Sequence, residues 1–228
     1  MRYLRWIRDT PVPPYRRSMT ILMSDPRVSR IPLREVDEPI VDLLDLAPAA
    51  SGLARFVRRG VLERLRIADL ALPAGINLRV VEGCRSSRDQ AAIIAAYGDQ
   101  VRAARPGASA QELHELTSRY VAPLETAPHV AGAAVDLTLV DADGRELWMG
   151  SALDATPEES DGGCFMAAEG LDDMAMIHRA MLVAALEPTG LVNYPTEWWH
   201  WSFGDRYWAY VTGATHALYG PLPMADAA

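Results

Sequence analysis

Two of the five histidines in the chain stand close to carboxylates in spacings that could support catalysis. His129 opens the segment HVAGAAVD, which ends in Asp136, and His200 closes the segment EWWH, which begins with Glu197. Two imidazoles and one carboxylate are a common ligand set for a catalytic zinc ion that keeps one coordination position open. The additional glutamate could then act as general base on the zinc-bound water.

The backbone around each segment must fold in a particular way for these residues to meet. Residues 133–140 (AAVDLTLV) are apolar and β-branched, which predicts a buried strand that carries Asp136 into the interior. A buried carboxylate without a partner is unfavourable, so a metal ion or an arginine is expected beside it. Residues three apart on a strand face opposite sides, so Glu197 and His200 need a bulge or a strand end to reach one centre. Gly132 would let the backbone pass close to that centre.

Other interpretations stay open on residue types and spacing alone. Asp136 could cap a strand end, and Glu197 with His200 could form a surface pair beside aromatic core residues. A ferrous ion held by two histidines and one carboxylate is a second option for the metal. The six residues between His129 and Asp136 fit that pattern poorly, because its usual histidine and carboxylate are separated by one residue.

The basic residues exclude several classes of enzyme. Lys and Arg together number 22, and every one of them is Arg. Without lysine the chain cannot form a Schiff base, hold nucleotide phosphates as a P-loop does, or build a serine–lysine dyad. Arginine does not deprotonate in proteins, so histidines and carboxylates must carry any acid–base chemistry.

The net charge of −8 argues against nucleic acid as a partner, although arginines cluster near the start of the chain. That cluster is interpreted as a solvated tail (Arg2, Arg5, Arg8, Arg16 and Arg17). No uncharged apolar run reaches about 18 residues, so no membrane partner is expected. The first residues do not resemble a signal peptide, and we expect a cytoplasmic protein in which Cys84 and Cys164 are free thiols. Cys84 could be activated by the adjacent Arg85, but no cysteine–histidine pattern accompanies it.

Hydrophobic periodicity predicts a single α+β domain with a mainly antiparallel sheet and flanking helices, and the strand that carries Asp136 would place the candidate zinc site at the sheet. We expect an irregular N-terminal arm at 1–34, a catalytic domain at 35–215 and a tail at 216–228. The predicted strands are 76–82, 133–140, 145–149 and 191–203. Helices are predicted at 53–70, 110–121 and 171–186. Another helix of about twenty residues is predicted to begin at Ser87, with Ser86 or Ser87 as its N-cap. A long loop is predicted at 150–168.

The two segments together resemble a known family. HVAGAAVD has the form H-x-x-G-x-A-x-D and EWWH the form E-x-W-H, in the order seen in zinc D-alanyl-D-alanine dipeptidases of the vancomycin-resistance type, within the D-Ala-D-Ala metallopeptidases. Gly83-Cys84-Arg85, Met149-Gly150-Ser-Ala-Leu-Asp154 and the segment from His178 to Leu191 are also similar to family segments. The resemblance covers roughly residues 36–212.

The resemblance implies a role for each matching residue. His129, Asp136 and His200 would bind Zn²⁺. Glu197 would deprotonate the zinc-bound water and later protonate the leaving amine, while Arg85 would stabilise the oxyanion. Asp154 would hold the ammonium group of a small peptide substrate, with D-Ala-D-Ala as the lead. Without the resemblance, Arg85 is interpreted as a surface salt-bridge residue and Asp154 as a loop cap.

The chain departs from the family pattern where the substrate is recognised. Ala127 stands where the family has a serine that contacts the substrate carboxylate, and a methyl group cannot form that hydrogen bond. Val130-Ala131 replaces a Ser-Arg pair, and Cys84-Arg85-Ser86 replaces an aromatic-Arg-Pro segment. The loop before Cys164 carries an acidic run, Glu158-Glu159-Ser-Asp161. The catalytic residues are thus retained while the recognition residues differ.

We therefore expect zinc-dependent hydrolysis of a small dipeptide, with two alternatives. One is a biosynthetic-pathway hydrolase that acts on a modified amino-acid amide or another dipeptide. The other is a binding module that keeps the metal without turnover, against which Glu197 and Arg85 argue. The tryptophans around His200 (Trp198, Trp199, Trp201 and Trp208) are expected to form core and pocket wall.

Overall fold

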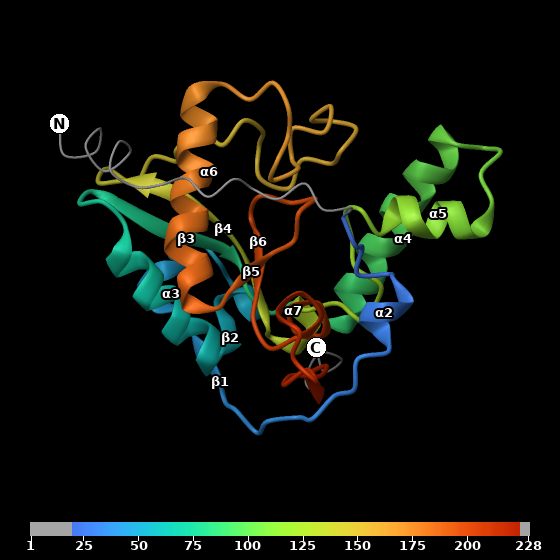
Figure 1. The fold of residues 1–228 in the computed structure, drawn as a ribbon, viewed down its shortest axis with the longest axis horizontal. Coiled ribbons are helices and arrows are strands. Elements are labelled where there is room, and N and C mark those ends of the chain that lie inside the picture. Colours follow the sequence, from blue (N-terminus) through green and yellow to red (C-terminus); the bar gives the residue numbers. More distant parts are fainter. Residues whose placement is uncertain (1–19, 224–228) are drawn as a thin grey trace.

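A four-stranded antiparallel sheet lies at the centre of the molecule, and a computed structural model describes it within residues 20–223 (Figure 1). Its strands lie in the order β3 (Ile76–Glu82), β4 (Ala134–Asp141), β6 (His200–Ser202) and β5 (Val192–Asn193). A separate antiparallel pair joins β1 (Ile40–Asp42) to β2 (Phe56–Arg58). The α+β class with an antiparallel sheet and flanking helices is confirmed.

Strand β4 is the buried centre of this sheet, as its composition predicts. Every residue from Ala134 to Val140 is buried, and Leu137 and Leu139 are completely shielded from solvent. β3 and β6 flank β4 and form antiparallel ladders with it. A strand paired on both edges and covered on both faces is expected to consist of apolar and β-branched residues throughout, and Asp136 is the exception within it.

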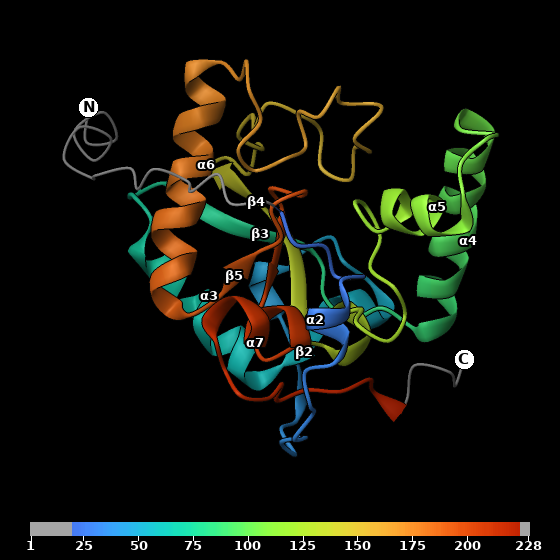
Figure 2. The ribbon, with the colours of Figure 1, turned by 45° about the vertical axis from the view of Figure 1, so that its right-hand side comes forward.

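Helices cover the sheet on two sides (Figures 1 and 2). Helix α3 (Arg59–Ala71) contacts α6 (Asp173–Leu186), and α4 (Ser87–Ala104) contacts α5 (Ala110–Thr117) on the other side. Two short helices, α2 (Pro26–Ser29) and α7 (Arg206–Thr212), contact each other.

Local capping explains where α4 begins. The hydroxyl of Ser86 accepts a hydrogen bond from the backbone N–H of Asp89 (2.9 Å), which satisfies one of the free donors in the first helical turn. The predicted start and length of this helix are confirmed. Helix α5 is also capped, by Ser109, but it ends at Thr117 rather than at residue 121.

The helix predicted at 53–70 starts later than expected. Residues Gly52–Arg55 form a 3-10 turn, and Phe56–Arg58 pair with β1 before α3 begins at Arg59. The backbone N–H of Arg58 also donates to the carbonyl of Gly132 (2.8 Å). These partners are distant in sequence, so helical periodicity could not reveal them.

Two predicted strands are also corrected. The return strand at 145–149 is reduced to an isolated bridge between Val140 and Glu146. The strand at 191–203 divides into β5 and β6, because the chain turns between them and the N–H of Tyr194 donates to the carbonyl of His200 (3.0 Å). The long loop at 150–168 is confirmed as a series of turns and bends.

The described part of the N-terminal arm packs on the body. Met23 and Val28 are buried with Tyr194 and Tyr207 in a small apolar cluster, and Leu33 pairs with Ala217 in an isolated bridge. The arginine cluster at 2–17 lies outside the described residues. None of the helices in residues 20–223 is long and apolar enough to span a lipid bilayer.

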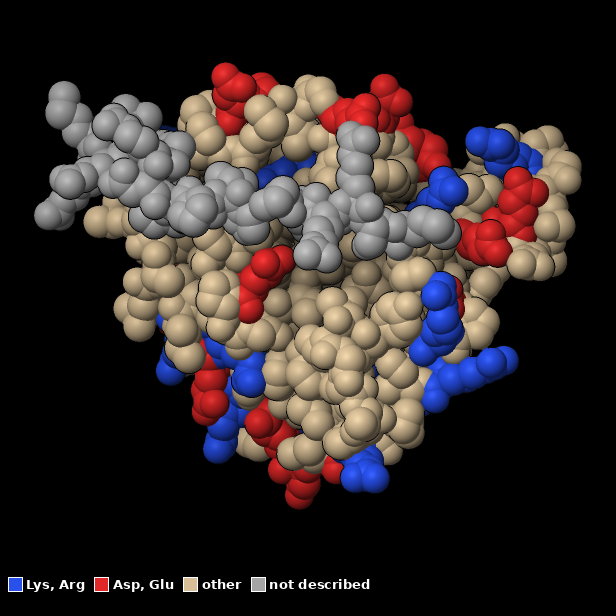
Figure 3. Space-filling view, in the orientation of Figure 1, with Lys and Arg blue, Asp and Glu red and all other residues tan. Residues whose placement is uncertain are grey.

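The visible surface carries charges of both signs (Figure 3). Acidic side chains lie along the upper edge of this view, over the loop between β4 and α6, and arginines lie mainly toward the lower and right-hand edges. The acidic run of that loop, which includes Glu158 and Glu159, is exposed. Cys84 and Cys164 are buried free thiols, as expected.

Gly83 provides a test of how tightly the segment after β3 is packed. A Cβ atom at Gly83 would overlap the carbonyl oxygen of Phe56 and approach that of Ala54 to 3.0 Å. We expect Gly83→Ala to lower the free energy of unfolding by about 2 kcal/mol, measured by urea denaturation. Gly98→Ala is the control, because the nearest atom to its Cβ lies at 3.8 Å within helix α4, and it should stabilise the protein by about 0.5–1 kcal/mol. Equal stability of both variants would contradict this packing.

Candidate active site

The sheet register places three functional side chains in one row. Glu82 on β3 is opposite Asp136 on β4, and Asp136 is opposite His200 on β6. Directly opposed residues of an antiparallel pair point to the same face, so these three side chains are neighbours. The register of β3 shifts between Val80 and Glu82, a bulge-like irregularity that sets the position of Glu82.

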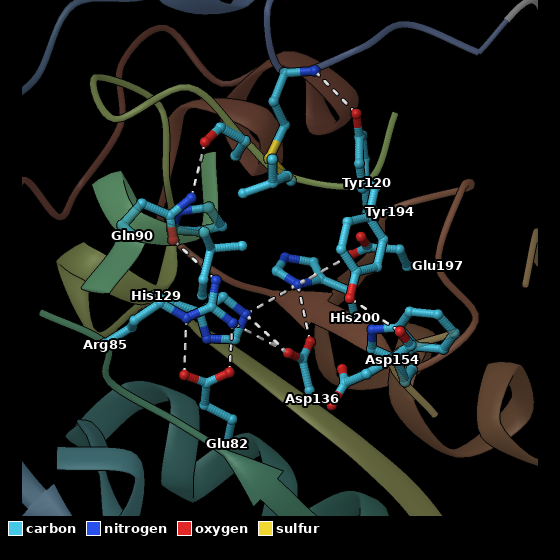
Figure 4. A pocket seen from close by; sticks show the side chains of 16 residues that line it. Glu82, Arg85, Gln90, Tyr120, His129, Asp136, Asp154, Tyr194, Glu197 and His200 are labelled. Atoms are coloured by element: carbon cyan, nitrogen blue, oxygen red, sulfur yellow. Dashed lines mark hydrogen bonds and ion pairs between the residues drawn. The ribbon is translucent and has the colours of Figure 1, made fainter. Parts of the chain in front are cut away.

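His129 joins this row from the short 3-10 turn His129–Ala131, and the three predicted ligands converge (Figure 4). Nε2 of His129 lies 3.1 Å from Nδ1 of His200 and 3.3 Å from Oδ2 of Asp136. Nδ1 of His200 lies 3.0 Å from Oδ1 of Asp136. Each residue offers one ligand atom, and these atoms all lie within 4.8 Å of one another.

The surroundings of His129 suit a metal ligand. Its Nδ1 lies 2.6 Å from the carbonyl oxygen of Gly83, which can only accept, so Nδ1 carries the proton. The lone pair then resides on Nε2, the atom that faces Asp136 and His200. A backbone carbonyl that fixes the tautomer in this way is usual for histidines that bind metals. Two imidazoles and a carboxylate therefore fit a divalent cation.

Gly132 ends this turn in a conformation and a space that suit glycine. It has a φ of +65°, in the left-handed region that favours glycine. A Cβ atom there would meet Ile40 Cδ1 at 2.9 Å and Cys84 Sγ at 3.1 Å. A glycine at this position is thus required by conformation and by space.

Burial and mutual charge set the ionisation of the three ligands. Burial alone would raise the pKa of Asp136, but the neighbouring His129 and His200 outweigh it and hold the pKa well below its usual range. Burial would lower the pKa of His129, but the Asp136 carboxylate outweighs it and the pKa is raised. Burial lowers the pKa of His200, which Asp136 opposes only in part. The carboxylate is thus charged and available to a cation.

Glu197 lies in the turn between β5 and β6, where its carboxylate Oε2 is 3.7 Å from Nδ1 of His200. The side chain of Asn193 holds this turn by donating to the carbonyls of Glu197 (2.8 Å) and His200 (3.0 Å). Because the turn ends as β6 begins, both residues reach one centre, which satisfies the requirement for a strand end. Burial, with the negative charges of Asp136 and Asp154, raises the pKa of Glu197 well above its ordinary value.

Arg85 follows β3 and is held by two partners that sequence reasoning missed. Its Nε donates to Glu82 (2.8 Å), its Nη2 donates to the other oxygen of Glu82, and its Nη1 donates to Gln90 (2.9 Å). Nη2 is 3.9 Å from Oδ2 of Asp136. Burial would lower the pKa of Arg85, but Glu82 outweighs it and the net shift is upward. Arg85 is therefore a fixed cation within the site rather than a surface salt-bridge residue.

Asp154 lies at the exposed mouth of the same cavity, at a positive φ of +61°. Its carbonyl accepts a hydrogen bond from the hydroxyl of Tyr120 (2.9 Å). Desolvation of its carboxyl group, together with the negative charges of Asp136 and Glu82, raises its pKa to about 7. Ala127 is buried and lines a different, smaller cavity.

The cavity itself has a volume of about 220 Å³. Trp199 lines it, while Trp198 and Trp201 are fully buried in the core, in agreement with the expected core and pocket wall. Cys84 is not suited to act as a nucleophile, because burial raises the pKa of its thiol to about 12. The residues that line the cavity are Met23, Glu82, Arg85, Gln90, Ile93, Tyr120, Val121, Ala122, Pro128, His129, Asp136, Asp154, Tyr194, Glu197, Trp199 and His200.

Glu82 and Gln90 carried weak signals in the sequence. Glu82 ends a predicted strand three residues before Arg85, and Gln90 stands in the first turn of the helix that follows. Neither residue type nor spacing distinguished them from surface residues. The fold brings both side chains into contact with Arg85.

A buried site with two histidines, an aspartate and a nearby glutamate, built on the central strand of an antiparallel sheet and its neighbour, is that of a metal-dependent hydrolase. The family model described as D-ala-D-ala dipeptidase, peptidase M15, matches residues 56–216. The chain belongs to this family and is a metallopeptidase.

Curated relatives agree with this family. A D-alanyl-D-alanine dipeptidase of Synechocystis is 27% identical over 91% of this chain and 94% of its own length. Dipeptidases of the same name from Enterococcus faecalis and Enterococcus faecium are 34% and 35% identical over 40% of this chain and 43% of their own. Among solved structures, the LD-carboxypeptidase LdcB is 20% identical to this chain, and the match covers 78% of this chain and 73% of LdcB. The TM-score is 0.39, which is too low to support an argument about function.

Metal content tests the ligand set directly. The purified protein should contain about one divalent ion per chain by mass spectrometry of the metal. A chelator should lower the melting temperature, because a bound ion stabilises the folded state and relieves the charge of buried Asp136. His129→Ala should lose the ion, and His114→Ala, on an exposed face of α5, should retain it. Retention of the ion by His129→Ala would contradict the assignment.

Proposed function

We propose that the protein is a zinc-dependent dipeptidase with D-Ala-D-Ala as the lead substrate. The observation that carries this proposal is the convergence of the ligand set with Glu197 and Arg85 on one cavity. The family and its curated relatives support a peptide substrate. A non-catalytic binding module would have no use for a buried glutamate and a fixed arginine beside the ligands.

His129, Asp136 and His200 would hold the zinc ion. When bound, zinc polarises the carbonyl of the scissile bond and lowers the pKa of a water molecule. Glu197 takes the proton of the attacking water and delivers it to the nitrogen of the leaving amine. Burial raises the pKa of Glu197, which makes its carboxylate a stronger proton acceptor.

Arg85 and Asp154 complete the proposed roles from two sides of the cavity (Figure 4). Arg85 stabilises the negative charge that develops on the carbonyl oxygen. Glu82 and Gln90 fix its guanidinium in advance, so little reorganisation is needed as the charge appears. Asp154, at the mouth, receives the ammonium group of the substrate and thereby sets its direction in the site.

Glu197→Gln tests the general base. The amide has the same shape but cannot accept the proton, so kcat should fall by about a hundredfold to ten-thousandfold. The metal content should be unchanged, because Glu197 is not one of the three ligands. Glu112→Gln, on α5, is the matched control and should keep full activity. Full activity of Glu197→Gln would show that another group takes the proton.

Asp154→Asn tests the ammonium contact. Loss of the negative charge should raise KM for a dipeptide with a free amine by about tenfold. A substrate whose amine is acetylated has no ammonium group, so its KM should be the same for both proteins. An equal rise in KM for both substrates would show that Asp154 acts on the shape of the loop instead.

A further inference from the structure

Arg179 is a buried cation to which the proposed catalysis gives no role. It lies on α6, in the segment from His178 to Leu191 that resembles the family, and only 3% of its surface is exposed. Burial lowers the pKa of its guanidinium to about 10, so the side chain is still charged at neutral pH. A buried charge is unfavourable unless it is well hydrogen-bonded, so the partners of Arg179 indicate what it does.

The hydrogen bonds of Arg179 hold both ends of the long loop at 150–168, which lies beside α6 (Figure 1). Nε donates to the carbonyl of Met149 (2.7 Å), directly before this loop. Nη2 donates to the carbonyl of Gly163 (2.6 Å), and Nη1 donates to those of Phe165 and Met166. Arginine carries five N–H donors in a planar fork, so one side chain can bind four carbonyls together. One guanidinium thus fixes the segment from Gly163 to Met166, the clamped segment, against the start of the loop.

Two glycines allow the ends of the loop to approach this guanidinium. Gly150 has a φ of +92°, and a Cβ atom there would overlap Leu171 and lie 3.3 Å from Nη2 of Arg179. A Cβ atom at Gly163 would lie 3.5 Å from the carbonyl oxygen of Gly150. The start and the end of the loop are therefore packed together at Arg179.

The clamped segment is bonded in turn to the backbone on both sides of Glu197. The N–H of Met166 donates to the carbonyl of Pro195 (2.9 Å), two residues before Glu197. The N–H of Trp198, the residue after Glu197, donates to the carbonyl of Cys164 (3.0 Å). A displacement of the clamped segment would therefore move the turn that carries Glu197.

Asp154, the other proposed functional residue of this region, has a contact of its own. Its carbonyl accepts a hydrogen bond from the hydroxyl of Tyr120 (2.9 Å), which lies outside the loop. Tyr120 can hold Asp154 without the clamped segment. Loss of the clamp is thus expected to affect Glu197 more than the proposed ammonium contact.

We propose that Arg179 is a positioning residue for Glu197 and acts through the clamped segment. The inference rests on the proposed role of Glu197 as general base. Among the described residues, those that line the cavity do not include Arg179, so it does not act on the substrate directly. A general base must lie within hydrogen-bonding reach of the water that it deprotonates, and a misplacement of about 1 Å can cost about a hundredfold in rate. A guanidinium outside the cavity thus sets the geometry of the proton transfer inside it.

Steady-state kinetics of Arg179→Lys tests the proposal. Lysine keeps the charge but has three donors on one nitrogen, so it cannot hold four carbonyls in the same geometry. We expect kcat to fall by about tenfold to a hundredfold, while KM for D-Ala-D-Ala changes by less than about threefold and the metal content stays the same. Arg179→Gln removes the buried charge, keeps two donors and should show the same pattern, so either variant decides if the other does not fold.

Arg206→Lys is the matched control for these kinetics. Arg206 also donates to backbone carbonyls, those of Ile31 (3.0 Å) and Glu125 (2.6 Å), but it does not hold the loop at 150–168. The control should keep the parent kcat and KM. An unchanged kcat in the Arg179 variants, or a rise in KM alone, would overturn the inference.

A double-mutant cycle shows whether Arg179 acts through Glu197 or only through the stability of the fold. In Glu197→Gln the base is already lost, so adding Arg179→Lys should lower the residual kcat by less than about threefold. A merely structural role would lower the fraction of active protein whatever the residue at 197, and the two single effects would then multiply. A kcat for the double variant equal to that product would contradict the inference.

Hydrogen exchange of the metal-loaded protein separates this inference from the proposed catalysis, because it needs no turnover. Arg179→Lys should raise the exchange rates of the amides of Met166 and Trp198 by about tenfold and leave those of β4 unchanged. If this result is found in a protein that hydrolyses no dipeptide, the connection between Arg179 and the turn stands and the hydrolase function fails. Unchanged exchange at both amides, or an equal rise throughout the fold, would show that Arg179 does not hold this turn.

Discussion

The carboxylate of Asp136 lies in the middle of the most deeply buried strand, and much of the site is arranged around it. In an apolar interior such a charge is tolerated only when it is paired. The register of three strands supplies the neighbours, with His200 on one side and Glu82 on the other, and the turn at His129 supplies the second imidazole. A divalent ion at this point would satisfy the carboxylate and both histidines together.

The second constraint is the immobilisation of Arg85. Two carboxylate oxygens of Glu82 and the amide of Gln90 hold its guanidinium in one orientation. A cation fixed in this way can stabilise negative charge at a defined point in the cavity.

Local signals predicted some elements well and others poorly. The β-branched run at 133–140 and the serine cap at Ser86 act within a few residues, so the buried strand and helix α4 could be predicted. The start of α3 could not, because Phe56–Arg58 are held by β1 and by Gly132, which lie far away in sequence. The division of the last strand depended on Asn193, whose side chain holds the turn that contains Glu197. The residues next to Asn193 in the sequence do not indicate that its side chain holds this turn.

The residue types and spacing of HVAGAAVD and EWWH by themselves predicted a candidate ligand set and a candidate general base, and hydrophobic periodicity along the chain predicted the α+β class, because metal chemistry and periodicity depend on local composition. The tertiary structure alone decided how Arg85 is held and that Glu82, Gln90 and Asp154 line the same cavity as the candidate metal ligands. Those features arise where β3, α4 and the loop between β4 and α6 meet. Their contacts join residues far apart in the chain, and hydrogen bonding and burial at such contacts are set by the packed fold rather than by neighbours in sequence.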